Sequence, residues 1–168
     1  MIRTAILTIS DRSSRGERED LSGPALASEV TKLGWEVTKT GIVPDEFERI
    51  QVTLLDWCAD RQIDLILTTG GTGFSPRDIT PEATLSVVER LAPGIPEAMR
   101  AASLKITPHA MLSRSAAGIK NRTLIVNFPG SPKAAVENLA SIAPVLPHAI
   151  ELLQESPESE KGHIPHTH

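Results

Sequence analysis

The sequence has few of the residues that build disulfide frameworks, zinc sites or membrane spans. Its 168 residues include one cysteine, Cys58, which excludes an internal disulfide framework and a cysteine-based zinc site. No apolar run is long enough to cross a membrane, and no signal-peptide pattern is present. We therefore expect a cytoplasmic protein that does not associate with membranes.

The sequence also has no excess of positively charged residues. The chain has 17 lysines and arginines against 21 aspartates and glutamates, which gives a formal net charge of −4. General nucleic-acid binding relies on a basic surface, so we expect no nucleic-acid partner, and any anion must be bound locally. With 40% hydrophobic residues, the chain can bury a core without disulfides or metal.

Apolar segments alternate with helical patterns along the chain, which predicts a single α/β domain with a mostly parallel central sheet in a three-layer α/β/α arrangement. Strands are expected at residues 2–10, 35–43, 64–68, 116–119 and 123–128, with a turn between the last two. Helices are expected at residues 22–33, from residue 45 onward, and at 81–90, 96–106 and from residue 132 onward. The domain is assigned to residues 1–154, and residues 155–168 are expected to form a disordered polar tail.

The most informative segment is the glycine turn that follows the strand at residues 64–68. Gly70, Gly71, Thr72 and Gly73 come directly after this strand, and glycines there let main-chain N–H groups approach an anion closely. Thr80 is predicted to be the N-cap of a helix with Pro81 at its first position, which would aim the positive end of the helix at the turn.

Asp78 lies between the glycine turn and this helix, where its carboxylate could hold a Mg²⁺ ion shared with a bound phosphate. The segment matches neither common phosphate motif, since no Lys-Ser or Lys-Thr pair closes a P-loop and the spacing is not G-x-G-x-x-G. The residues alone leave two interpretations open, an anion site or a tight turn with a solvated aspartate.

Two other strands are followed by polar segments of the same kind. Pro129, Gly130 and Ser131 follow the strand at 123–128, with Ser131 as a predicted helix cap, and Ser10, Asp11 and Arg12 follow the first strand. Such segments would converge at the carboxyl edge of a parallel sheet, where open α/β sheets bind ligands. For the segment that begins at Ser10, an ordinary surface loop is the alternative.

A second carboxylate, Asp45, opens the sequence Asp-Glu-Phe-Glu. This D-x-x-E pattern predicts a capping box at the start of the next helix, which is a sufficient structural reason for Asp45.

With these segments in view, the chain resembles the molybdopterin adenylyltransferases, bacterial molybdenum-cofactor enzymes related to the G domain of gephyrin. The resemblance runs over residues 6–153. It is carried by Ser10-Asp11-Arg12, Ser22-Gly23-Pro24, Val43-Pro44-Asp45-Glu46, residues 70–82, residues 103–108, residues 111–119 and Pro129-Gly130-Ser131-Pro132. Several long blocks in the same order make a chance resemblance implausible.

The resemblance implies a reaction in which AMP passes from ATP to the terminal phosphate of molybdopterin, with Mg²⁺ as cofactor and pyrophosphate released. It implies catalytic roles for Asp78 and Asp45, with Mg²⁺ at Asp78. The nucleotide and phosphate site would be lined by Gly70, Gly71, Thr72, Gly73, Pro129, Gly130 and Ser131. It also implies a homotrimer and hand-over of the product to a molybdate-inserting protein.

Five polar residues are candidate ligands for the substrate: Ser10, Asp11, Arg12, Ser113 and Arg114. Arg114 could bind a phosphate or the pterin through its forked guanidinium, and surface ion pairing is the alternative for Arg12 and Arg114. Two other functions stay open. A non-catalytic molybdopterin-binding or scaffolding module would tolerate loss of Asp78, and a nucleotide hydrolase would need residues that activate water.

Overall fold

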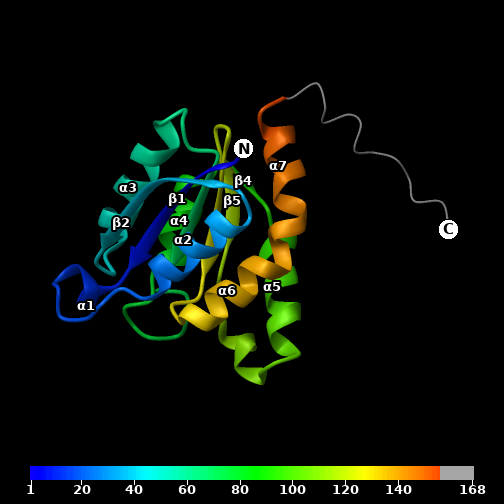
Figure 1. Ribbon diagram of the computed structural model, residues 1–168. Helices are drawn as coiled ribbons and strands as arrows, with labels where there is room; N and C mark the ends of the chain where they lie inside the picture. Colours follow the sequence, from blue (N-terminus) through cyan, green and yellow to red (C-terminus); the bar gives the residue numbers. More distant parts are fainter. Residues whose placement is uncertain (156–168) are drawn as a thin grey trace.

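The computed structural model, which describes residues 1–155, has a six-stranded sheet between two layers of helices (Figure 1). The strands are β1 (Arg3–Ile9), β2 (Glu36–Val43), β3 (Leu65–Thr69), β4 (Arg90–Leu91), β5 (Ala117–Lys120) and β6 (Thr123–Phe128). Their order across the sheet is β2-β1-β3-β6-β5-β4. β2, β1, β3 and β6 are parallel neighbours, whereas β5 runs antiparallel to both β6 and β4. The predicted mostly parallel sheet is confirmed.

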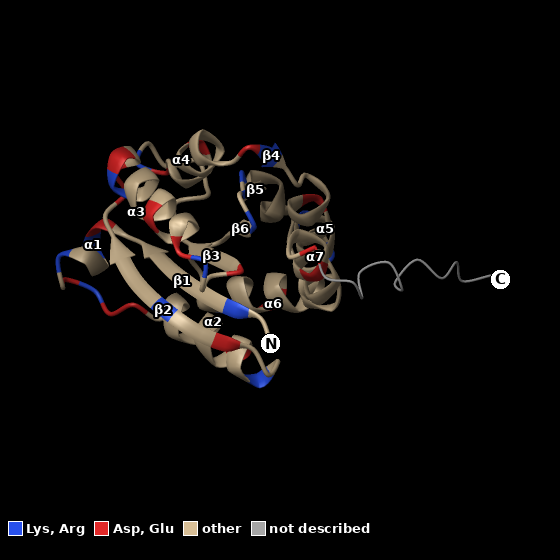
Figure 2. Ribbon diagram, turned by 90° about the horizontal axis from the view of Figure 1, so that it is seen from above, with Lys and Arg blue, Asp and Glu red and all other residues tan. Residues whose placement is uncertain are grey.

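The helices cover both faces of this sheet, as the view along the layers shows (Figure 2). They are α1 (Asp11–Ser14), α2 (Ser22–Lys32), α3 (Phe47–Ala59), α4 (Thr80–Val87), α5 (Gly94–Leu104), α6 (Pro132–Ile142) and α7 (Leu146–Leu153), with 3₁₀ turns η1 (Pro108–Leu112) and η2 (Ala143–Val145). α3 and α4 pack on one face, and α2, α5, α6 and α7 pack on the other. The three-layer α/β/α architecture is therefore confirmed.

Alternation along the strands divides the core between these two faces. In β1, Ile6 packs with the α2, α5, α6 and α7 side, while Ala5 and Leu7 pack with α3 and α4. Successive side chains of a strand point to opposite faces, so a strand covered on both faces is mostly apolar, and any polar residue in it needs a hydrogen-bond partner. β3 is buried at every residue, and the hydroxyls of its two polar residues, Thr68 and Thr69, both form hydrogen bonds.

One predicted helix is too long, and several short elements were not predicted. The helix expected at 81–90 ends at Val87, because Arg90 and Leu91 instead pair with Ile119 and Gly118 as edge strand β4. The predicted turn after β5 is confirmed, with Asn121 in the left-handed region at φ 53°. α1, α7 and the two 3₁₀ turns were absent from the expected elements.

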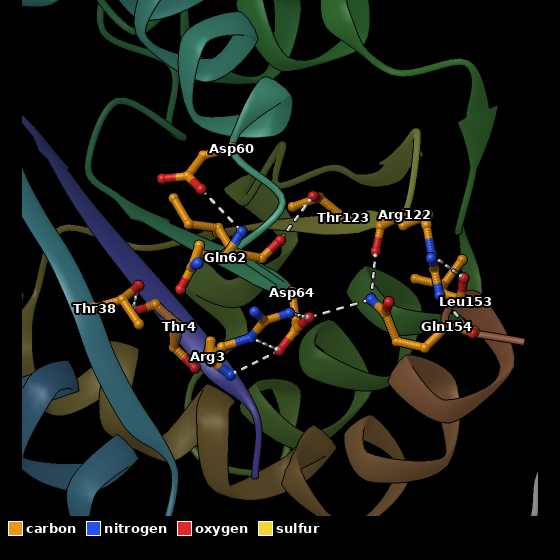
Figure 3. Close-up of polar contacts among 11 residues, drawn as sticks. Arg3, Thr4, Thr38, Asp60, Gln62, Asp64, Arg122, Thr123, Leu153 and Gln154 are labelled. Atoms are coloured by element: carbon orange, nitrogen blue, oxygen red, sulfur yellow. Dashed lines mark hydrogen bonds and ion pairs between the residues drawn. The ribbon is translucent and has the colours of Figure 1, made fainter. Parts of the chain in front are cut away.

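A polar cluster closes the amino edge of the sheet, where β1 and β3 begin (Figure 3). The Asp64 carboxylate accepts hydrogen bonds from Arg3 N, Nε and Nη2 at 2.9, 3.0 and 2.7 Å, and from Gln154 Nε2 at 3.1 Å. Arg122 donates to the carbonyls of Leu153 and Gln154 at the end of α7. The cluster thus ties the last helix to the sheet, at the edge opposite the glycine turn.

The expected tail lies outside the described residues, apart from Glu155. Among residues 1–155, the helices are all too short or too polar to span a membrane.

Candidate functional site

Two cavities open at the carboxyl edge of the sheet, beyond the ends of β1, β3 and β6. The first has a volume of about 470 Å³ and the second about 550 Å³. Gly71, Asp78 and Gly130 line both cavities. The two strand-to-helix segments singled out in the sequence therefore converge, and Asp78 lies where the cavities meet.

The glycine turn after β3 requires glycine for two reasons. Gly70 and Gly71 have φ of +102° and +67°, a region that side chains other than glycine rarely adopt. A Cβ on Gly70 would lie 2.3 Å from the Ile9 carbonyl oxygen. One on Gly71 would lie 2.3 Å from Thr80 Oγ1 and 3.0 Å from Asp45 Oδ1. The turn is thus packed directly against β1 and the Asp45 carboxylate.

Thr80 supports this turn instead of capping a helix. The N-cap of α4 is Ile79, and Thr80 is the first residue of the helix, so the predicted cap is wrong. The Thr80 hydroxyl donates to the Gly70 carbonyl at 2.9 Å, and its N–H donates to the Gly71 carbonyl at 3.1 Å. The buried Thr80 therefore supplies hydrogen bonds to the Gly70 and Gly71 carbonyls, which fixes the turn to the start of α4.

Asp45 has a different partner from the one that its sequence pattern predicted. α3 begins after Glu46 with no side-chain cap, so the capping box is wrong. Instead, Asp45 Oδ2 accepts a hydrogen bond from Asp11 N at 2.9 Å, and Asp45 N donates to Asp11 Oδ1 at 3.0 Å. This reciprocal pair joins the segments that follow β1 and β2 and turns the Asp45 carboxylate toward the glycine turn.

The charge state of Asp45 reflects this position. Burial raises the pKa of the Asp45 carboxyl, the hydrogen bond from Asp11 N lowers it, and the neighbouring charges of Asp11 and Asp78 raise it. The net shift is upward from the ordinary value of 3.8. A cation placed beside these carboxylates would stabilise the ionised form.

Asp78 sits at the end of a loop that is braced by its own hydrogen bonds. Asp78 N donates to the Ser75 carbonyl at 2.9 Å, and Ser75 N donates to Asp78 Oδ2 at 3.0 Å. Among residues 1–155, no group of three or more His, Cys, Asp or Glu side chains is placed to bind a metal ion. Mg²⁺ commonly binds through one or two carboxylates with substrate phosphates completing its shell, and Asp45 and Asp78, which both line the second cavity, fit that pattern.

The second cavity combines groups that can bind a phosphate with four carboxylates, so a phosphate bound there needs a cation beside it. Ser10, Asp45, Gly70 and Ser131 line it, as does the start of α2 at Ser22. Ser131 is the N-cap of α6, as predicted, and accepts a hydrogen bond from Ala134 N at 3.4 Å. The N-terminus of α6 thus opens onto the cavity, and helix N-termini attract anions, whereas at the start of α2 the Gly23 N–H already donates to the Asp20 carboxylate.

Other candidate residues lie in the first cavity or outside both. Thr72, Gly73, Ser113 and Pro129 line the first cavity. Asp11, Arg12 and Arg114 line neither. Asp11 receives two hydrogen bonds from Arg77, each 2.8 Å long, which lower the pKa of its carboxyl. Arg12 is exposed on α1, and the Arg114 guanidinium donates to the protein's own carbonyls.

Several polar residues of the first cavity were not predicted from the sequence: Arg100, Ser103, His109, Glu137 and Asn138. Arg100 Nη1 donates to the Ser113 and Ser115 carbonyls at 3.3 and 3.0 Å, and Ser103 Oγ donates to Asn138 Oδ1 at 2.9 Å. Most of them lie on α5 and α6, where polar residues at helical spacing usually indicate a solvated face. The only sequence signal was Ser103, which begins one of the blocks that carry the resemblance.

The fold and the two adjoining cavities are those of a ligand-binding α/β domain, and similarity to known proteins identifies its class. A family model described as a probable molybdopterin binding domain matches residues 5–148. The chain therefore belongs to this family.

The names of individual relatives are more specific than the description of the family. The chain is 44% identical over 154 residues to a molybdopterin adenylyltransferase from Helicobacter pylori strain J99, covering 90% of this chain and 88% of that protein. It is 45% identical to gephyrin from Dictyostelium discoideum over 97% of this chain, but spans only 24% of that longer protein. The crystal structure of the molybdopterin biosynthesis enzyme MoaB from Thermus thermophilus superposes with a TM-score of 0.88 at 48% identity, over 94% of this chain and 99% of that one.

Proposed function

We propose that this protein is a molybdopterin adenylyltransferase, which transfers AMP from ATP to the terminal phosphate of molybdopterin and releases pyrophosphate. The observation that carries the proposal is the junction of two cavities at Asp78, Gly71 and Gly130. A transfer between two substrates needs two adjoining sites that share the reacting centre. Relatives named molybdopterin adenylyltransferase at 41–44% identity support the same conclusion.

The two cavities are assigned to the two substrates by their chemistry. The second cavity has the glycine turn, the N-terminus of α6 with its cap Ser131, and carboxylates that could hold a cation, so it takes the triphosphate of ATP. The first cavity, with Ile106, Ala110 and Leu112 beside Arg100 and Asn138, is suited to a flat heterocycle with polar edges, so it takes the pterin. The α-phosphate of ATP and the terminal phosphate of molybdopterin would then meet beside Asp78.

In this mechanism the pterin phosphate is itself the nucleophile, so the protein needs no covalent intermediate. Gly70 and Gly71 let main-chain groups approach the phosphates, and the N-terminus of α6 stabilises their negative charge. Asp78, with Asp45 beside it, would hold Mg²⁺, which would supply neutralisation of phosphate charge. The residues act by positioning the two phosphates and by electrostatic stabilisation.

We also propose the co-substrate and cofactor of the protein, its oligomeric state, its compartment and the protein that accepts its product. ATP and Mg²⁺ are its co-substrate and cofactor, the assembly is a homotrimer, the compartment is the cytoplasm, and the product passes to a molybdate-inserting protein. These parts rest on the resemblance of the sequence. Light scattering on the purified protein tests the trimer directly.

The central test is a reaction of purified protein with molybdopterin, ATP and Mg²⁺, followed by mass spectrometry. We expect adenylylated molybdopterin and an equal amount of pyrophosphate, and no product when EDTA removes the metal ion. Molybdopterin binding without any adenylylated product would favour the non-catalytic module. Release of phosphate or AMP from ATP without molybdopterin would favour a hydrolase.

A further inference from the structure

Arg114 was predicted to be a substrate ligand, but the structure places it in contact with the loop that carries Asp78. It lies between η1 and β5, one-third exposed, and its side chain lines neither cavity. Its guanidinium spans the base of the loop that carries Asp78. Nε donates to the Gly73 carbonyl at 2.7 Å, Nη2 donates to the Asp78 carbonyl at 2.8 Å, and Nη1 pairs with Glu82.

These contacts hold both ends of one loop. Gly73 begins the loop and Asp78 ends it, so a single planar group fixes the separation of the two ends. The main chain of Arg114 adds a further bond, from its N–H to the Thr72 carbonyl at 2.8 Å. Guanidinium donors lie in a rigid fork, which makes this spacing far stiffer than separate flexible side chains would.

Thr80 already ties Gly70 and Gly71 to the start of α4, and Arg114 holds the part of the loop between these points, from Gly73 to Asp78. The hydrogen bonds between Ser75 and Asp78 shape the loop internally, but they do not attach it to the domain. Arg77 attaches the tip through Asp11, although the Arg77 side chain is 59% exposed. Exposed ion pairs contribute little rigidity because water competes for both partners.

We propose that Arg114 is a positioning residue, which fixes the Asp78 carboxylate at the junction of the two cavities without touching either substrate. The role in catalysis rests on the proposed function. The bonds to Gly73, Asp78 and Glu82 use one N–H of each guanidinium nitrogen and hold the group against the loop, and Arg114 lines neither cavity. Arg114 acts on Asp78 directly, because the Asp78 backbone carbonyl accepts one of its hydrogen bonds.

The first test measures the loop without any ligand. Hydrogen exchange of the purified protein should show amides of residues 73–79 exchanging about tenfold faster in Arg114→Gln than in wild type, with the rest of the domain unchanged. Arg114→Lys should give an intermediate increase, because a lysine keeps the charge but cannot bridge both carbonyls and Glu82 in one plane. Arg61→Gln, an exposed arginine in the turn after α3, is the matched control and should change nothing near the loop.

The second test separates positioning from binding. If Arg114 positions Asp78, Arg114→Gln lowers kcat for adenylylation about 100-fold, since a displacement of about 1 Å costs that much, and KM for molybdopterin changes little. Titration of Mn²⁺ with a non-hydrolysable ATP analogue should show metal affinity weakened in the same variant. Arg114→Lys should recover part of both.

The outcomes of these experiments distinguish the positioning role of Arg114 from the proposed adenylyltransferase function. Unchanged exchange of residues 73–79 in both Arg114 variants overturns the positioning role, whatever the activity. A raised KM for molybdopterin with normal kcat also overturns it, because the guanidinium would then be a ligand. If wild type makes no adenylylated product, the proposed function fails, while exchange and Mn²⁺ binding still decide whether Arg114 holds the loop. Should Arg114→Gln fail to fold, Arg114→Lys carries the same measurements.

Discussion

At the scale of single residues, Asp78 is the group on which the proposed reaction depends most. Its Oδ2 accepts a hydrogen bond from Ser75 N, a contact that an asparagine oxygen can also make. Asp78→Asn should therefore leave the melting temperature nearly unchanged while lowering turnover by orders of magnitude. Molybdopterin binding should survive. Steady-state kinetics with a calorimetric binding titration decides this, and turnover within a few-fold of wild type would remove Asp78 from the mechanism.

Gly71 allows a test of how closely the turn is packed. Gly71→Val should destabilise the protein by about 1–3 kcal/mol and abolish ATP binding, because both backbone strain and a clash with Thr80 result. Gly34→Val is the matched control, since Gly34 has a similar φ of +77° but open space where a Cβ would lie. Urea denaturation should show a smaller loss for the control, with ATP binding intact. If the Gly71 and Gly34 variants bound ATP equally well, the glycine turn would not be a nucleotide site.

Asp45 gives a prediction about pH. Because its folded pKa is raised, the protonated carboxyl contributes stability at low pH, and this contribution is lost as the pH rises through the folded pKa. An asparagine can still accept the hydrogen bond from Asp11 N but carries no charge. Asp45→Asn should therefore be more stable than wild type at pH 7 and no more stable near pH 3, with much lower turnover. Thermal unfolding across pH checks the first part, and a gain that grows in acid would contradict it.

Residue-level roles were the least predictable part of the sequence. Asp45 and Thr80 both occupy positions that match helix caps, and the local pattern contained no sign of their true partners. Those partners, Asp11 N and the Gly70 carbonyl, are 34 and 10 residues away. A side chain that can satisfy either a local or a distant group follows the tertiary structure, which local spacing does not describe.

At the scale of elements, long strands and helices were predictable because their periodicity is strong. α2 starts at the predicted Ser22, and the buried strand before the glycine turn is shifted by one residue only. Short elements were not predictable. β4 has two exposed residues and exists because β5 offers an unpaired edge, so it has no pattern of its own.

The attachment of α7 gives a prediction at this scale. Gln154 Nε2 donates to Asp64 Oδ1 and to the Arg122 carbonyl, so Gln154→Ala should lower the free energy of unfolding by about 1 kcal/mol. Adenylylation should be unaffected, since the cluster lies at the opposite edge of the sheet from Asp78. A chain that ends at Glu155 should match wild type in both respects. Urea denaturation and the activity assay test both variants, and reduced activity in either would show that the two edges are coupled.

At the scale of the whole molecule, the parallel sheet explains why the site was largely predictable. The ends of β1, β3 and β6 necessarily meet at one edge, so residues as far apart as Ser10, Gly71 and Gly130 could be placed together. Residues of the first cavity were missed because α5 and α6 bring them in from outside the sheet. Topology locates strand ends reliably, whereas it leaves open which helical side chains turn toward a cavity.

Asp64 and Asp78 lie at opposite edges of the sheet, so we expect substitutions at these two residues to act independently on the stability of the protein and on its reaction. Burial raises the pKa of Asp64, but its hydrogen bonds with Arg3 outweigh this, so the net pKa is lowered. Asp64 therefore contributes stability above the unfolded pKa, and that stability is lost as the pH falls through the folded value. Asp64→Asn should cost roughly 3 kcal/mol at pH 7 and less in acid. Combined with Asp78→Asn, its effect on stability should be additive, and a large coupling energy measured by urea denaturation would contradict this.

The amino-edge cluster also has a practical consequence. Met1 and Gln154 line the same hollow beside Asp64, so both ends of the described chain leave the domain on the side away from the cavities (Figure 1). A solid support or a fused protein attached at either end would leave the glycine turn facing the solution. The domain is therefore suited to oriented immobilisation, with every tethered copy presenting its cavities outward.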